Sequence, residues 1–139
     1  MSVILPDYLL DTGVANRVAL EEPAILQRLA HTQSVFVPDI VLGELYFGAY
    51  LYTYRHNSTK FLDIYDAFYM RYCNEILYCD DETARIYGAI SAELTAKGGI
   101  MQQNDMWIAA LSRQYNLTLA TMDSDFQRIP GLSFVLFSH

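Results

Sequence analysis

The chain has 139 residues, which is the length of one domain with a core of its own. Hydrophobic residues make up 53% of the chain and charged residues 18%, which excludes a disordered protein. No apolar run reaches the roughly 20 residues of a membrane span. The net charge of −7 has the wrong sign for a protein that binds nucleic acid through basic side chains. If nucleic acid is the ligand, bound cations must offset part of the acidic charge.

The spacing of apolar residues and of turn residues predicts alternating strands and helices along the whole chain. The predicted strands cover residues 8–10, 34–37, 75–79, 117–122 and 133–137. The predicted helices cover residues 21–30, 39–54, 61–72, 80–97 and 104–115. Strands that alternate with helices imply a parallel sheet covered on both faces. We therefore expect one three-layer α/β domain over residues 1–139, with a central parallel sheet of four to five strands flanked by helices.

Several ends of these elements carry specific signals. Thr12 and Gly13 follow the first strand and indicate a turn. Asp39 follows Pro38 and is in position to cap the next helix. The acids at residues 80–82 lie at a helix start, where negative charge is favourable and needs no functional explanation. Ligands of open parallel sheets bind beyond the carboxyl ends of the strands, so side chains at those ends are the candidates for a site.

The N-terminus and the cysteines indicate a cytoplasmic protein. Residues 1–10 contain no Lys or Arg and are interrupted by Pro6 and Asp7, which does not fit a signal peptide. Cys73 and Cys79 have no second pair, so neither a zinc site nor a disulfide framework is indicated. We interpret both as reduced, structural thiols.

Five acidic residues stand out by their positions. Asp11 and Asp123 lie at the carboxyl ends of predicted strands, with Asp125 close behind, and Glu44 and Asp105 lie on predicted helices. Taken singly, each also fits an ordinary structural role: a turn residue at the strand ends, a solvated position for Glu44, and a helix cap for Asp105. Glu44 is unusual, because apolar neighbours surround it and a buried acid requires a cation or a hydrogen-bond donor.

Four sequence segments carry these acids. They are Leu9-Leu10-Asp11-Thr12, Pro38-Asp39-Ile40-Val41-Leu42-Gly43-Glu44-Leu45-Tyr46-Phe47-Gly48, Asn104-Asp105-Met106-Trp107-Ile108-Ala109-Ala110 and Thr121-Met122-Asp123-Ser124-Asp125-Phe126. Together they resemble the four acidic blocks of PIN domains, most closely those of the VapC toxins of toxin–antitoxin pairs. The blocks come in the family's order, and the resemblance spans residues 9–132. The chain departs from the family at Gly13, where Asn or Ser usually follows Asp-Thr.

The resemblance implies an endoribonuclease that depends on Mg²⁺ or Mn²⁺ and cuts RNA, with tRNA or rRNA as plausible substrates. Both ions prefer oxygen ligands, and either one activates water near neutral pH, so no protein base is required. We give no role to the three histidines, which lie outside the four blocks. The residues expected to hold the metal are Asp11, Glu44, Asp105 and Asp123, with Asp125 as a secondary candidate, and Thr12, Asn104 and Thr121 are expected to orient them.

Other enzymes with an acid at the end of a strand fit the sequence less well. A phosphatase of the haloacid-dehalogenase type requires a second acid two residues after the first, where this chain has Gly13. A receiver domain requires a late Lys, whereas the last one here is Lys97. Neither a P-loop nor a dinucleotide-binding glycine pattern occurs. The alternative that stays open is a PIN-like module that binds RNA or a protein without cutting.

The aromatic residues indicate surfaces that bind other protein segments. Tyr46, Tyr50 and Tyr54 share one helix, and the next helix is also rich in aromatic residues. We expect a groove between these two helices that accepts an amphipathic segment. The resemblance implies that this segment is the tail of a VapB-like antitoxin, with a basic residue that reaches the acidic site. Eleven Tyr and seven Phe also favour a homodimer. The nine Lys and Arg residues are scattered, so RNA would meet only a modest basic rim.

Overall fold

The computed structural model describes residues 7–137, so most of the N-terminal segment considered above lies outside the described part of the chain. Five strands form one parallel sheet in the order β3-β2-β1-β4-β5. The strands are β1 (Asp7–Leu10), β2 (Ser34–Pro38), β3 (Glu75–Leu77), β4 (Thr118–Thr121) and β5 (Phe134–Leu136). The helices are α1 (Thr12–Ala19), α2 (Pro23–Leu29), α3 (Asp39–His56), α4 (Lys60–Tyr72), α5 (Asp81–Ala96), α6 (Gln103–Gln114) and the 3-10 helix η1 (Ser124–Arg128).

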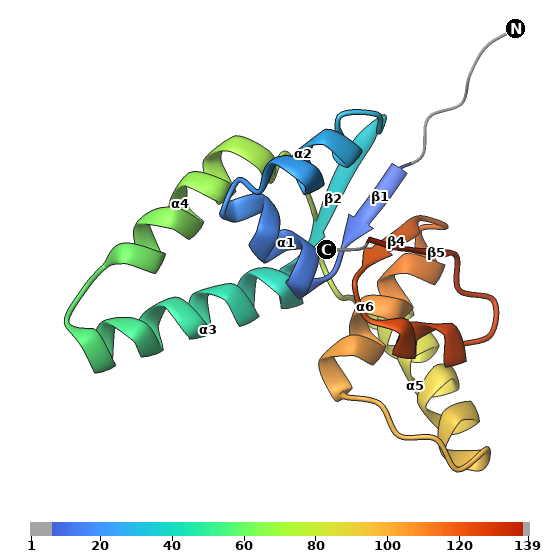
Figure 1. The fold of residues 1–139 in the computed structure, drawn as a ribbon. Helices are drawn as coiled ribbons and strands as arrows, with labels where there is room; N and C mark the ends of the chain where they lie inside the picture. Colours follow the sequence, from blue (N-terminus) through green and yellow to red (C-terminus); the bar gives the residue numbers. More distant parts are fainter. Residues whose placement is uncertain (1–6, 138–139) are drawn as a thin grey trace, which may run out of the picture.

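Helices flank this sheet, with α1 to α4 on one side and α5 and α6 on the other (Figure 1). The division follows from right-handed crossovers, because the chain moves outward from β1 to β2 and β3 and then returns to β4 and β5. The predicted α/β fold with a central parallel sheet is confirmed. The order in which the chain adds strands to the sheet reverses between the neighbours β1 and β4. Ligands of such sheets bind at this point.

The two central strands are apolar and buried on both faces. Leu9 and Leu10 of β1 and Leu119 and Ala120 of β4 are fully buried. The backbone amide of Asp11 donates to the carbonyl of Ala120 at 3.2 Å, so the pairing of these strands continues to Asp11. This acid is therefore fixed by the sheet itself. Within residues 7–137, no helix is both long and apolar enough to cross a membrane.

The turn predicted at Thr12 and Gly13 is wrong, because helix α1 begins at Thr12. Asp11 is its N-cap, and Oδ1 of Asp11 accepts a hydrogen bond from the backbone amide of Val14 at 2.8 Å. Asp, Thr and Gly after a strand are typical of turns and of helix starts alike. The burial of Val14 and Val18 in the core favours the helix, and this long-range packing was not visible in the local pattern.

The starts of α3 and α6 also differ from expectation. Pro38 and not Asp39 is the N-cap of α3, and Asp39 is the first helical residue, whose Oδ1 accepts from the next backbone amide at 2.8 Å. Helix α6 begins at Gln103, and its N-cap Gln102 makes no side-chain capping bond. Asp105 consequently lies inside the first turn, so a helix cap no longer explains this acid.

Helices α3 and α4 form a hairpin that extends away from the sheet (Figure 1). Aromatic rings pack between the two helices. Tyr46 lies edge-on to Tyr65 with ring centroids 6.5 Å apart, and Tyr52 lies edge-on to Phe61 at 4.8 Å. These rings fill part of the space between the two helices, and the groove that we expect for an antitoxin tail stays a prediction.

One part of the exposed apolar surface of the hairpin lies on α3. Phe47, Tyr50 and Tyr54 are exposed, and their spacing of three and four residues places them on one face of the helix. We call this surface the α3 stripe. It runs along α3 from the sheet toward the tip of the hairpin, and it is a surface available to a partner.

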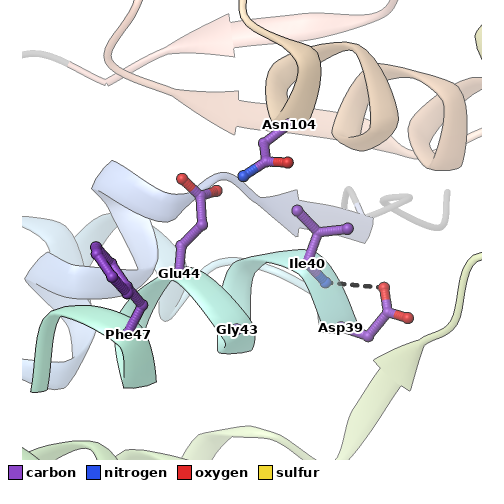
Figure 2. Close-up of a pocket in the computed structure, with 6 residues that line it drawn as sticks. All are labelled: Asp39, Ile40, Gly43, Glu44, Phe47 and Asn104. Carbon is purple, nitrogen blue, oxygen red and sulfur yellow. Dashed lines mark hydrogen bonds between the residues drawn. The ribbon is translucent and has the colours of Figure 1, made fainter. Parts of the chain in front are cut away.

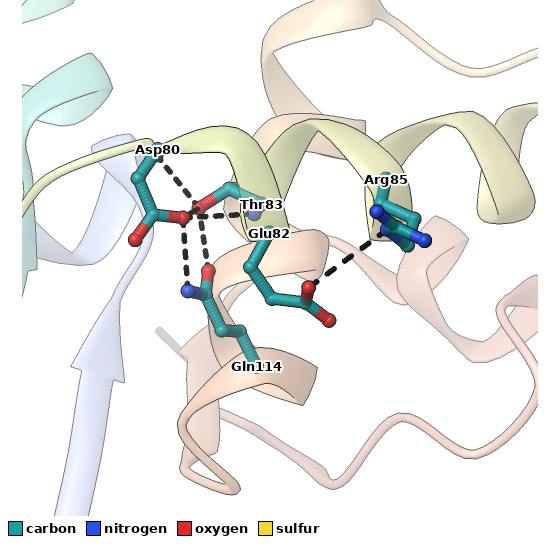
Figure 3. A network of polar contacts seen from close by, with 5 residues as sticks. All are labelled: Asp80, Glu82, Thr83, Arg85 and Gln114. Atoms are coloured by element: carbon teal, nitrogen blue, oxygen red, sulfur yellow. Dashed lines mark hydrogen bonds and ion pairs between the residues drawn. The ribbon is translucent and has the colours of Figure 1, made fainter.

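The acids at residues 80–82 have the structural role that we predicted (Figure 3). Asp80 is the N-cap of α5, and Oδ1 of Asp80 accepts from the backbone amide of Thr83 at 3.0 Å. The hydroxyl of Thr83 accepts in return from the backbone amide of Asp80 at 3.0 Å, which completes a capping box. Gln114 of α6 donates through Nε2 to Oδ1 of Asp80 at 3.1 Å. This network ties the start of α5 to the end of α6.

Candidate active site

Asp11 is held at the reversal point between β1 and β4 and is only 7% exposed. While Oδ1 caps α1, Oδ2 accepts a hydrogen bond from the hydroxyl of Thr121, the last residue of β4. Burial raises the pKa of Asp11 above its ordinary value, the two hydrogen bonds oppose this, and the charges of Asp123 and Glu44 add to it. The carboxylate is thus fixed in place by two donors, yet its ionised form is disfavoured.

Glu44 lies on α3 and is half-buried. Its Oε1 accepts a hydrogen bond from the hydroxyl of Thr12 at 2.6 Å. The buried residues Val41 and Leu45 on the same helix anchor α3 against the core, which leaves Glu44 at the edge of the buried face. Because Thr12 follows Asp11 directly in the chain, its hydroxyl joins the end of β1 to α3 and holds Glu44 near Asp11.

Asp105 lies in the first turn of α6 and is half-buried. Its pKa is raised to about 6, mainly by burial and then by the charges of Asp123, Glu44, Asp11 and Asp125, in that order. All four of the other predicted acids therefore lie near enough to repel this carboxylate. The first turn of a helix favours negative charge, but this effect does not overcome burial beside like charges.

Asp123 and Asp125 follow β4 and are both exposed. Asp123 is the N-cap of η1, a short helix that the sequence did not predict, and Oδ1 of Asp123 accepts from the backbone amide of Asp125 at 2.9 Å. The hydroxyl of Thr121 accepts from the backbone amide of Asp123 at 3.0 Å. Arg128 lies 3.6 Å from Oδ2 of Asp125. Asp125 is therefore partly neutralised and is the outermost of the five acids.

Among residues 7–137, no basic side chain forms an ion pair with the other four carboxylates. Each of the five ion pairs among residues 7–137 involves an acid outside the set Asp11, Glu44, Asp105 and Asp123. Charges that are partly buried and close together require a compensating cation or protonation. A cation in their midst would stabilise them, and oxygen ligands of this kind favour a hard divalent ion.

The carboxylates do not form a ready-made cage. Within the described part of the chain, no three His, Cys, Asp or Glu side chains come close enough together to hold a metal ion as they stand. Mg²⁺ usually keeps several waters and takes only one or two protein carboxylates directly, so the donor set fits a hydrated divalent cation better than a fully coordinated one.

A cavity of about 560 Å³ opens beside the acids (Figure 2). Two of the predicted residues line it: Glu44 on α3 and Asn104 at the start of α6, whose side chains face each other across the opening. Asp11, Asp105 and Asp123 are not among the residues that line it. The remaining lining residues are Asp39, Ile40, Gly43 and Phe47.

Sequence reasoning missed these four lining residues. The available signal was their helical spacing, because Ile40, Gly43 and Phe47 lie within one turn of Glu44 on the same face of α3. Gly43 has no side chain to occupy the cavity, and nothing lies within 4 Å of the place where its Cβ would be.

Comparisons with known proteins agree with this geometry. The PIN domain family model matches residues 8–132. Ribonuclease VapC2 of Rickettsia felis is 32% identical over 130 residues, which cover 90% of this chain and 93% of the relative. Ribonuclease VapC2 of Haemophilus influenzae is 30% identical, with the same coverage of both chains. In the crystal structure of VapBC2 from R. felis bound to a DNA fragment from their promoter, a chain 27% identical superposes with a TM-score of 0.81 over 95% of this chain and 99% of that one. The protein therefore belongs to the PIN-domain family and, within it, to the VapC ribonucleases.

Proposed function

We propose that this protein is the toxin of a toxin–antitoxin pair, a divalent-metal-dependent endoribonuclease that cleaves phosphodiester bonds of cellular RNA in the cytoplasm. The observation that carries the proposal is the set of crowded carboxylates at the reversal point of the sheet, without a basic partner among the described residues. The VapC relatives, named as ribonucleases, share this fold along nearly their whole length. The whole chain acts as one nuclease domain.

Asp11, Glu44, Asp105 and Asp123 are the residues that would hold Mg²⁺ or Mn²⁺, directly or through water, and Asp125 adds charge from outside. When bound there, a divalent cation supplies activation of water and offsets the charge on the scissile phosphate. Asp105 must be ionised to bind it, so with its pKa near 6 the site is favoured above that pH.

Three polar residues position this set. The Thr12 hydroxyl fixes the rotamer of Glu44, and the Thr121 hydroxyl fixes both the carboxylate of Asp11 and the backbone of Asp123. Groups that orient ligands in this way affect metal affinity by about 10- to 100-fold. Asn104 lies on the opposite wall of the cavity, where its amide can donate to a substrate oxygen.

Cleavage of RNA with and without metal tests the proposal. Purified protein should be inactive on bulk tRNA and rRNA in EDTA and active after Mg²⁺ or Mn²⁺ is added in excess. Mapping of RNA ends after induction, in the wild type and in Asp11→Asn, should then identify the substrate and the cleaved position. Full activity in EDTA would contradict the metal mechanism.

A VapB-like antitoxin is the expected inhibitor. Its tail would lie on the α3 stripe and place a basic side chain at the carboxylates, where it competes with the metal. Replacing that basic residue of the tail with Ala should restore cleavage more than it weakens binding, since the aromatic contacts are kept. An inhibitor whose binding is unaffected by Tyr50→Ala and Tyr54→Ala would refute this arrangement.

We also propose a homodimer, because exposed aromatic side chains favour an interface. Besides the α3 stripe, Tyr69 and Met70 on α4 are exposed and provide further apolar surface. Sedimentation at micromolar concentration should show a species of twice the chain mass. A monomer alone at that concentration would reject the dimer.

A further inference from the structure

Phe47 is an exposed aromatic side chain at the edge of the acidic site. It lies on α3 three residues after Glu44, and its ring is 69% exposed. Phe47, Glu44 and Asn104 line the same cavity, with Phe47 beside Glu44 on one wall and Asn104 opposite (Figure 2). Three residues of helix rise correspond to about 4.5 Å, so Phe47 leaves α3 close to Glu44.

Among the described residues, the cavity has no positively charged lining residue that could bind an RNA phosphate. Asp39 and Glu44 carry the only formal charges among the six lining residues, and both are negative. The protein as a whole carries a net charge of −7. Affinity for RNA usually depends on cationic side chains that neutralise phosphates. At this cavity, an interaction with the base can add to the contact that a bound cation would make with the phosphate.

Stacking of a base on an aromatic ring is such an interaction, because it is independent of charge and contributes about 1–3 kcal/mol per base. The cavity volume of about 560 Å³ is in the range of ligand sites. The amide of Asn104 on the opposite wall can donate to and accept from the edge of a base. An aromatic ring and a hydrogen-bonding group thus line the same cavity, with Glu44 between them.

We infer that Phe47 is the stacking platform for an unpaired base next to the scissile phosphate, with Asn104 at the edge of that base. This inference rests on the proposed ribonuclease function and specifies its substrate class. A base inside a duplex is stacked on its neighbours and cannot lie on Phe47. The substrate is therefore a single-stranded loop or end rather than a continuous helix.

Two variants of Phe47 and one matched control test the inference. Phe47→Ala removes the ring, and Phe47→Trp keeps a stacking surface. Tyr54→Ala removes a ring that is 89% exposed on the same face of α3, two turns beyond the cavity. The substrate is a short single-stranded RNA that carries 2-aminopurine next to the mapped cleavage site. We measure steady-state cleavage with Mn²⁺ and the quenching of 2-aminopurine, which reports stacking directly.

Phe47→Ala should raise KM by about tenfold, with kcat changed by less than about threefold, which corresponds to the loss of one stacked base. It should also abolish most of the quenching. Phe47→Trp should restore both values, and Tyr54→Ala should match the wild type. Paired into a duplex, the same RNA should be cleaved poorly by every variant.

Other results would overturn the inference. If the wild type cleaves RNA and Phe47→Ala has an unchanged KM and unchanged quenching, the stacking role is wrong while the ribonuclease function stands. If Phe47→Ala weakens only the binding of the antitoxin, the ring is a protein contact. If the wild type neither cleaves nor quenches the RNA in Mn²⁺, the proposed function fails and this inference fails with it.

Discussion

Two groups of acids lie at helix starts beyond the carboxyl ends of the sheet, and they have opposite properties. At the start of α5, burial has little effect on Asp80, and hydrogen bonds from Thr83 and Gln114 lower its pKa below the ordinary value. Around β1 and β4, burial and neighbouring carboxylates raise the pKa of both Asp11 and Asp105. Position alone does not distinguish the groups, since Asp80 and Asp11 each follow a strand and each cap a helix.

The difference lies in how each charge is balanced. The carboxylate of Asp80 has backbone and side-chain donors that belong to the fold, so its ionised form stabilises the protein (Figure 3). Asp105 lies among four other acids, so its ionised form destabilises the protein until a cation binds. Acids that the fold satisfies are structural, and acids that the fold leaves unbalanced mark the site. The predictions below separate these two behaviours.

The largest effect is expected from Asp11→Asn. Asn keeps an acceptor for the amide of Val14 but removes the charge that attracts the metal. RNA cleavage in Mn²⁺ should fall by about 100-fold or more, as is usual when a group that stabilises the transition state is lost. In EDTA the melting temperature should stay the same or rise, because repulsion among the carboxylates decreases. A variant that instead loses both fold and activity would show that Asp11 is structural.

Asp105→Asn should change stability with pH. The pKa of Asp105 is about 6 in the fold and 3.8 when exposed, so the folded state favours its protonated form. Its contribution to stability is therefore present below pH 4 and is lost as the pH rises through 6. In EDTA at pH 7.5, Asp105→Asn should raise the free energy of unfolding by about 1 kcal/mol, after allowance for solvent screening.

Denaturant unfolding from pH 4 to pH 8 measures this difference, which should shrink toward zero at the acidic end. Asp80→Asn is the matched control with the opposite sign, because the lowered pKa of Asp80 makes its contribution present above pH 4 and lost as the pH falls. If the stability difference between Asp105→Asn and the wild type does not depend on pH, burial and repulsion do not raise the pKa of Asp105 as we infer.

A smaller effect is expected from Asp80→Ala, which removes the N-cap of α5 and the link to Gln114. The melting temperature should fall by a few degrees, as for other lost helix caps. Cleavage per folded molecule and the affinity for Mn²⁺ should match the wild type, since Asp80 lies outside the site. Loss of Mn²⁺ binding in this variant would remove the distinction between the two groups of acids.

The smallest effect is expected from Gly13→Ser, which gives α1 one of the two residues, Asn or Ser, that the family resemblance leads us to expect after Asp-Thr. A Cβ at this position would lie 3.7 Å from Oδ1 of Asp11, an ordinary contact. Replacing a helical Gly should stabilise the protein by about 0.5 kcal/mol, with activity within about threefold of the wild type. Thermal unfolding and cleavage assays measure both. A loss of activity above tenfold would mean that the open space beside Asp11 is required.

The strands and most helices could be predicted, because buried runs such as Leu9-Leu10 and the apolar face of α4 have clear periods. The five acids could also be selected from the sequence, since their segments resemble known blocks. Helix α1 could not, because Asp11, Thr12 and Gly13 suit a turn as well as a helix start, and the choice depends on distant packing. The role of Phe47 could not be predicted either, since its exposure at the cavity depends on where α6 approaches α3.

Calorimetric titration with Mn²⁺ tests the central claim, that the unbalanced acids and not the satisfied ones hold a divalent cation. The samples are the wild type, Asp11→Asn and Asp80→Ala at pH 7.5, each checked for its fold by circular dichroism. We predict that the wild type and Asp80→Ala bind Mn²⁺ with the same affinity and that Asp11→Asn binds at least about tenfold more weakly. Equal affinity in all three proteins would contradict the claim.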